Sequence, residues 1–153
     1  MPQPRVGFLF RCYSDPYYLV PNAEVALRET QTVDPSGVPK RIMPLTLFTI
    51  DVELQRVVDL ADDGTLGVLG VTADELTTQW RAAVFAGTTP ITHAIGEAAR
   101  TAEVEALIYP SARVRGATNL AVIVDRLRRG SRLRINPSEG FGPGTTIEVS
   151  GTR

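Results

Sequence analysis

The chain has 153 residues, of which 43% are hydrophobic and 22% are charged, close to the average for soluble globular proteins. This length suits one ordinary domain, and the composition excludes disordered, collagen-like and coiled-coil chains. Sixteen Lys and Arg against seventeen Asp and Glu give a net charge of −1, which argues against a nucleic-acid binder driven by bulk charge. Lys40 is the only lysine, so almost any cationic group in a site must be a guanidinium.

The single cysteine, Cys12, excludes an internal disulfide and a cysteine zinc cluster. No apolar run approaches the ~18 residues of a membrane span. The first ten residues lack the pattern of a signal peptide. We therefore expect a cytoplasmic protein without a membrane segment.

The first sixty residues have mainly the pattern of β-strands, with one helix among them. The strand-like runs are residues 7–12, 17–20, 41–52 and 56–60. Pro44 favours an edge or a bulge in the first part of the third run. Asn22 is a good N-cap and is followed by apolar residues at helical spacing, which predicts a helix over residues 22–31. Turns or loops are predicted at Ser14-Asp15-Pro16 and at residues 34–37.

The middle of the chain has the pattern of two helices. Thr72 and Glu75 have the spacing of a capping box at the start of the first helix, and Gly87 is predicted to end it. The predicted buried face of this helix consists of Leu76, Trp80, Ala83 and Val84. A second helix is expected over residues 91–102, after Pro90.

The last third returns to β-structure, with strands predicted at residues 104–109, 119–125 and 146–149. Early strands, central helices and late strands indicate an α+β fold with a mixed, mainly antiparallel sheet. We expect a single domain over residues 1–153.

Three features that often mark functional sites have ordinary explanations here. Residues 140–144, GFGPG, lack the GK[ST] ending of a phosphate loop and are predicted to form a turn. His93 is the only histidine, and metal sites usually recruit several ligands, so a structural or helix-surface role is favoured and no metal is expected. A serine-hydrolase triad has little support without a GxSxG elbow.

Five arginines fall within nine residues at 126–134, RLRRGSRLR. The run could form an electrostatic platform for nucleic acid or an acidic partner, but the overall charge offers no general support. A solvated strand edge guarded by charge is the preferred interpretation.

The loop after the predicted strand at 104–109 places Ser111 and Arg113 at the end of a buried strand, where sites are often built. An ordinary turn with a side-chain hydrogen bond to its own backbone explains the serine equally well. Spacing alone does not choose between the two.

Three segments read together resemble a RES domain, a family named for an Arg, a Glu and a Ser in this chain order. They are YYLVPNAEVALRET from residue 17, ALIYPSAR from residue 106, and GATN from residue 116 followed by an apolar strand. The resemblance spans residues 5 to about 127, and the combination is specific although each segment alone is weak.

The resemblance implies the toxin of a toxin–antitoxin pair that consumes NAD, with a fold similar to ADP-ribosyltransferases. Such proteins degrade NAD by hydrolysis or phosphorolysis, or transfer ADP-ribose to a protein target, and their usual partner is an Xre-type antitoxin that covers the active site. We expect NAD degradation, with no direct contact to nucleic acid or membrane.

Carried over by position, the family Glu corresponds to Glu29, the strand Tyr to Tyr18 and the Ser to Ser111. The family Arg corresponds to Arg5, with Arg11 as a rival. Catalytic roles are expected for Glu29, Arg5 and Ser111, and cofactor binding for Tyr18, Arg11, Arg113 and His93.

Some of these residues also have ordinary interpretations. Glu29 lies near the end of its predicted helix, where a carboxylate meets the unfavourable pole of the dipole, although it could be a surface residue paired with Arg28. Tyr18 could simply pack in the sheet, and in a regular strand Tyr17 would point to the opposite face, so only one of the two is expected to line a pocket.

Two rival functions remain. The pair RV at Arg5 replaces the family's usual RF or RW, and few residues precede it, which would suit an interaction module that kept the fold and lost the chemistry. A nucleic-acid binder based on residues 126–134 would instead show steeply salt-dependent affinity.

Overall fold

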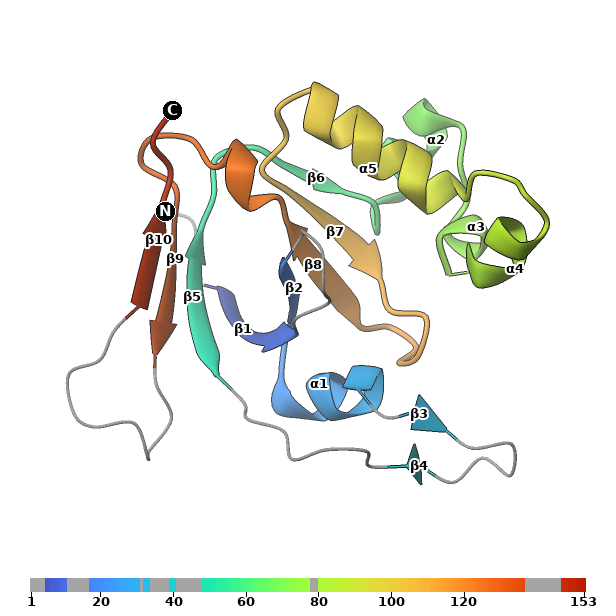
Figure 1. Ribbon diagram of the computed structural model, residues 1–153, viewed down its shortest axis with the longest axis horizontal. Coiled ribbons are helices and arrows are strands. Elements are labelled where there is room, and N and C mark those ends of the chain that lie inside the picture. The colour runs from blue at the N-terminus through green and yellow to red at the C-terminus, as the bar shows by residue number, and fades with distance from the viewer. Residues whose placement is uncertain are drawn as a thin grey trace.

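The computed structural model describes residues 5–10, 17–30, 32–33, 39–40, 48–77, 80–136 and 147–153. It confirms the α+β class: helices lie beside an eight-stranded, mainly antiparallel sheet (Figure 1). The strand order is β10-β9-β5-β1-β2-β8-β7-β6, and all neighbours are antiparallel except β6 and β7. Within the described ranges, none of the helices combines the length and the apolar character that a membrane span needs.

The strands of the large sheet are β1 (Arg5–Phe10), β2 (Tyr17–Val20), β5 (Thr49–Glu53), β6 (Val57–Asp59), β7 (Ala106–Pro110), β8 (Thr118–Val122), β9 (Arg132–Asn136) and β10 (Ile147–Ser150). A two-stranded sheet contains β3 (Thr32–Val33) and β4 (Pro39–Lys40). The helices are α1 (Ala23–Thr30), α2 (Asp63–Leu69), α3 (Ala73–Thr77), α4 (Trp80–Phe85), α5 (Ile91–Thr101) and the 3₁₀ helix η1 (Val124–Arg126). The predicted loops at 14–16, 34–37 and 140–144, Cys12 and the first part of the run at 41–52 lie outside the described residues.

The two faces of the sheet pack into different clusters, because side chains alternate along each strand. On one face, Leu19 of β2, Val122 of β8 and Ala106 of β7 join Leu133 of β9 in one core cluster. The strands β9 and β7 are separated by four others in the sheet, so the sheet curls around this cluster. The other face carries α5, whose Ala99 packs in a second cluster with β7 and its neighbours.

The helix at the N-terminal end of the chain begins as its sequence predicts. The side chain of Asn22 accepts a hydrogen bond from the amide of Val25 at 3.0 Å, which caps α1. Val25 and Ala26 pack with Val20 of β2, and this apolar contact seats the helix against the sheet. The cap and the packing therefore fix where the last turn of α1 lies.

The structure describes the helix predicted from the capping box to Gly87 in two parts, α3 and α4, and residues 78–79 between them lie outside the described residues. The predicted end is confirmed, because Gly87 has a positive φ of 71° and its amide donates to the Val84 carbonyl at 3.0 Å. The capping box itself is confirmed: the Glu75 carboxylate accepts from the Thr72 amide at 2.8 Å. Within α3, Thr77 donates its hydroxyl to the carbonyls of Ala73 and Asp74, one turn earlier in the helix. The predicted common face is not maintained, since Leu76 is buried whereas Val84 of α4 is 48% exposed.

A helix that the sequence pattern did not indicate, α2, precedes these two. It contains two glycines, which lower its intrinsic helix propensity. The Asp62 side chain accepts from the Thr65 amide at 2.7 Å, and the pKa of this carboxyl is lowered by that bond and by the Thr65 hydroxyl. A good cap and the buried Leu66 thus outweigh poor propensity.

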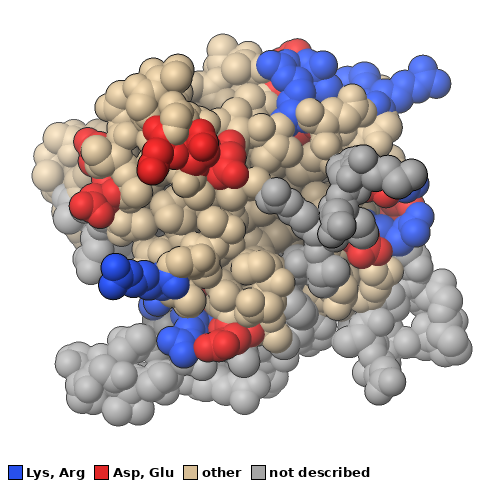
Figure 2. Space-filling model, turned by 180° about the vertical axis from the view of Figure 1, so that it is seen from behind, with Lys and Arg blue, Asp and Glu red and all other residues tan. Residues whose placement is uncertain are grey.

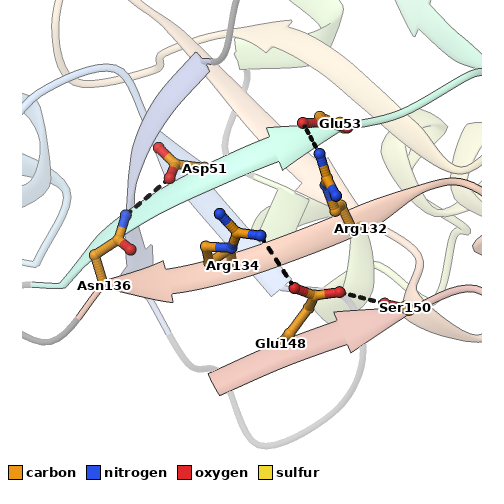
Figure 3. A network of polar contacts seen from close by, with 7 residues as sticks. All are labelled: Asp51, Glu53, Arg132, Arg134, Asn136, Glu148 and Ser150. Carbon is orange, nitrogen blue, oxygen red and sulfur yellow. Dashed lines mark hydrogen bonds and ion pairs between the residues drawn. The ribbon is translucent and has the colours of Figure 1, made fainter. Parts of the chain in front are cut away.

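The sequence suggested that the basic run at 126–134 forms a charged strand at the edge of the sheet. The structure contradicts this prediction. The second half of the run is β9, which lies between β5 and β10. Arg132 donates to Glu53 of β5 at 2.6 Å, and Arg134 to Glu148 of β10 at 3.4 Å (Figure 3). Acidic residues on both neighbouring strands neutralise these arginines, and a pattern within one segment does not reveal such cross-strand partners.

A buried carboxylate, that of Glu105, ties the start of β6 to the loop before β9. It is fully buried and accepts hydrogen bonds from three backbone amides, those of Gln55 at 2.6 Å, Arg56 at 2.7 Å and Arg128 at 2.6 Å. Burial alone would raise the pKa of this carboxyl, but the surrounding donors together outweigh burial and lower it. The ionised form therefore belongs to the folded state.

Replacing Glu105 by Gln is expected to lower the free energy of unfolding at pH 7 by about 2 to 3 kcal/mol, because one amide oxygen cannot accept three amides. Since the folded-state pKa is lowered, the wild-type contribution is present above the unfolded value, about 4.5, and is lost as the pH falls through the folded pKa. Urea unfolding from pH 7 to pH 3 should thus show a steeper acid loss for wild type than for E105Q. The exposed neighbour Glu103, changed to Gln, is the control, and equal pH profiles for E105Q and wild type would contradict this role.

Candidate functional site

Glu29 lies in the last turn of α1, with its side chain 20% exposed. A carboxylate at this end of a helix meets the negative pole of the helix dipole, which is unfavourable without compensating donors. The alternative partner Arg28 is ion-paired with Glu24 instead, at 3.0 Å. Donors for Glu29 come from elsewhere in the chain.

Two side chains from the far half of the chain donate to the same oxygen of Glu29. The Ser111 hydroxyl donates to Oε1 at 2.6 Å, and Asn119 Nδ2 donates to Oε1 at 2.9 Å. Ser111 follows β7 and Asn119 lies on β8, and both are buried. Hydrogen bonds to an ionised acceptor are short and strong, so the carboxylate is held in one orientation.

The Ser111 hydroxyl also organises its own loop. Its oxygen accepts hydrogen bonds from the amides of Arg113 at 3.1 Å and Val114 at 2.9 Å. The predicted turn with a side-chain hydrogen bond to its own backbone is therefore confirmed, and the same hydroxyl also contacts Glu29. Its one donor and both acceptor positions are in use, so in this arrangement the group orients Glu29 rather than acting as a free nucleophile.

The second carboxylate oxygen of Glu29 faces Arg113. The Arg113 Nε lies 3.8 Å from Oε2, in an ion pair with a partly exposed guanidinium. This distance is too long for a direct hydrogen bond. Oε2 is thus the oxygen of Glu29 with capacity to accept a hydrogen bond from a ligand.

Tyr18 and His93 line one cavity of about 590 Å³ between α5 and the sheet. Tyr18 reaches it from β2, whereas Tyr17 packs with the cluster on the opposite face, as strand alternation predicted. His93 lies on the exposed side of α5 at the cavity wall, so it is both a helix-surface residue and a pocket neighbour. The volume falls within the range of small-molecule pockets.

The cavity and the Glu29 cluster adjoin each other on one face of the sheet. Tyr109 lines the cavity and is paired in register with Asn119, which donates to Glu29. Leu107, Tyr109 and Ser111 share one face of β7 and its extension by alternation, and the first two line the cavity. Two residues of strand, about 7 Å, therefore separate the cavity wall from Ser111.

Of the two remaining predicted site residues, Arg5 and Arg11, the structure describes only Arg5. Arg5 is the first residue of β1 and pairs with Val52 of β5, whereas Phe10, five residues further on, pairs with Tyr18. Arg11 lies outside the described residues. Whether Arg5 or Arg11 corresponds to the arginine of the RES motif therefore stays open.

Asn119 and Tyr109 are the members of this site to which the sequence pattern assigned no role. Both occur in the quoted motifs, and strand alternation places Asn119 on the same face as Ala121 and Tyr109 on the same face as Leu107. The missing information was the register that places the two strands side by side. No group of three or more metal-ligating side chains is assembled within the described part of the chain.

This arrangement suits chemistry on a ligand with a hydroxyl donor and an aromatic or cationic ring. An oriented carboxylate oxygen can accept from a hydroxyl and stabilise positive charge that develops beside it. Tyrosine faces at the cavity can stack on a ring. A guanidinium beside the carboxylate, Arg113, can pair with an anionic group.

Comparison with known proteins identifies a family. No curated protein and no solved structure gives a match. The family model described as the RES domain matches residues 17–142, a span that contains Tyr18, Glu29, His93, Ser111, Arg113 and Asn119. This match covers most of the chain, and the protein therefore belongs to the RES domain family.

Proposed function

We propose that this protein is the toxin of a toxin–antitoxin pair and consumes NAD by cleaving the bond between nicotinamide and ribose. The observation that carries the proposal is the Glu29 carboxylate, oriented by Ser111 and Asn119 beside a cavity that Tyr18 lines. Membership of the RES domain family supports the same activity.

The reaction needs little acid catalysis, because the departing ring is already cationic. The bond between the ribose C1′ and the ring nitrogen breaks, and its electron pair leaves with the nitrogen, so nicotinamide departs neutral. Positive charge then develops on the sugar in an oxocarbenium-like transition state, as in glycoside hydrolysis. Water or phosphate attacks C1′ and loses a proton, giving ADP-ribose or its 1-phosphate.

The residues divide this work between them. Glu29 Oε2 accepts a hydrogen bond from a ribose hydroxyl and stabilises the charge that builds on the sugar. Tyr18 stacks on the cationic ring, a contact worth about 0.5 to 2 kcal/mol. Arg113, with Arg5 or Arg11, binds the pyrophosphate, and His93 is a neighbour at the cavity wall.

A partner protein belongs to this proposal. An Xre-type antitoxin covers the site and presents acidic or carboxyl-terminal groups to its arginines, because Arg pairs well with carboxylates. A complex formed this way keeps NAD out of the cavity. Full NAD-cleaving activity of the purified complex would argue against a covered site.

The acceptor of ADP-ribose distinguishes degradation from transfer to a protein. Free ADP-ribose, or its phosphate when phosphate is supplied, indicates degradation, which is the proposed route. Label from the adenylate part of NAD that remains on a protein band indicates an ADP-ribosyltransferase instead. Absence of nicotinamide release under all these conditions would favour a non-catalytic interaction module.

Replacing Glu29 by Gln is expected to lower the rate of nicotinamide release about 10²- to 10³-fold, because the neutral amide no longer stabilises the developing charge. Nicotinamide is measured chromatographically with purified protein, with and without phosphate. Glu24→Gln on the same helix is the matched control and should leave the rate unchanged, since this side chain is exposed and pairs with Arg28. Equal activity of E29Q and wild type would contradict the proposal.

Replacing Asn119 by Ala removes one donor to Glu29 and is expected to lower kcat about 10- to 100-fold with a smaller change in KM. Asn136→Ala is the matched control, because its side chain also donates to a carboxylate at 2.9 Å, that of Asp51, but on β9 (Figure 3). Thermal unfolding of both variants separates positioning from stability. Parallel losses of activity in the two variants would show that Asn119 has only a structural role.

A further inference from the structure

A second, arginine-lined pocket lies away from the Glu29 cluster. It has a volume of about 320 Å³ and is lined by Gln55, Glu103, Arg126, Arg128, Arg129 and Arg153. Basic side chains gather at an upper corner of the molecule (Figure 2), on the side where the C-terminus lies in Figure 1. Helix α1, which carries Glu29, lies at the opposite end of the sheet (Figure 1).

Backbone contacts bring these arginines together. The Arg128 amide is held by the buried Glu105, and Gln55 Nε2 donates to the Arg129 carbonyl at 2.8 Å. The Arg129 amide donates to the Arg153 carbonyl, which joins the loop to the end of the chain. At Gly151, a Cβ would clash with the backbone carbonyl of Arg128, so only glycine allows the two segments to approach this closely.

The charges in this pocket are poorly balanced. Glu103 is the one acidic residue among the lining residues given by the structure, and its pair with Arg128, at 3.5 Å between well-exposed groups, is weak. Arg129 and Arg153 make no ion pair within the described residues. The pocket therefore has an excess of guanidinium groups.

Arg126 adds an unsatisfied donor to the same wall. Its Nε is buried and has no hydrogen-bond acceptor among the described residues. The nearby Asp125 is 3.9 Å from this atom and is bound at 2.7 Å by Arg100. An anion in the pocket would supply acceptors that the described protein groups do not provide.

The shape and charge of the pocket favour a compact anion over a polynucleotide. Arg132 and Arg134, which would extend the basic surface along β9, are neutralised by Glu53 and Glu148 (Figure 3). A stripe of uncompensated charge that could follow a nucleic-acid backbone is therefore missing from this part of the described structure. A pocket of this volume, with several forked guanidinium groups, fits a group with closely spaced phosphates.

We propose that this pocket binds the diphosphate group of a small molecule, through Arg129 and Arg153 with Arg126 and Arg128. The site is separate from the proposed NAD-cleaving site and does not depend on that function. The same chemistry could come from inorganic pyrophosphate or from a nucleoside diphosphate.

Titration calorimetry of the full chain with inorganic pyrophosphate, and separately with ADP, tests the proposal. Saturable binding that weakens with salt is expected. Binding of both indicates recognition of the diphosphate alone, whereas binding of ADP only indicates that the nucleoside contributes. Either result supports the proposal, and no saturable binding of either ligand would overturn it.

The double variant Arg129→Gln with Arg153→Gln is expected to weaken binding about tenfold or more, since each lost charged hydrogen bond contributes to affinity. Arg132→Gln with Arg134→Gln is the control with the same change of net charge. Equal losses in the two double variants, or no loss in the first, would overturn the proposal, as would preferential binding of a single-stranded oligonucleotide or a polyglutamate peptide. Thermal unfolding confirms that each variant is folded.

Discussion

The hydrogen bonds to one oxygen of Glu29 connect helix α1 with two neighbouring segments that lie 82 and 90 residues further along the chain. They place the last turn of α1 against the end of β7 and the start of β8. A carboxylate at a helix C-terminus would otherwise favour an exposed position. The hydrogen bonds from Ser111 and Asn119 offset its unfavourable interaction with the helix dipole and the cost of its partial desolvation. The position of α1 and the order of the loop after β7 are thus linked to the same charged group.

This linkage explains why the site has one occupied and one available carboxylate oxygen. Oε1 receives two donors, while Oε2 faces Arg113 at a distance that leaves room for another donor. The orientation of the Glu29 carboxylate is therefore fixed before a ligand binds. Such preorganisation is the main physical requirement for stabilising positive charge in a transition state.

Much of this arrangement could be predicted from local pattern. The alternation of Tyr17 and Tyr18, the cap at Asn22 and the capping box at Thr72 depend on neighbours in sequence, and all three are confirmed. The helix α2 was not predicted because its two glycines lower its helix propensity, although a local cap and a buried leucine stabilise it. The other failures depend on distant partners. The position of β9 inside the sheet comes from pairing with β5 and β10. Similarly, the contact of Asn119 with Glu29 spans ninety residues, which no local spacing reveals.

Glu105 stabilises the fold through backbone groups of its neighbours and leaves their side chains available for other contacts. Three of its donors are main-chain amides, so these bonds survive any substitution at Gln55, Arg56 or Arg128 that keeps the amide hydrogen. The sequence at these positions is consequently free to vary without loss of the internal anchor, proline excepted. Selection can therefore act on the Arg128 side chain for its contacts at the surface. The fold at this position is maintained by the buried carboxylate of Glu105, which binds Arg128 through its backbone amide.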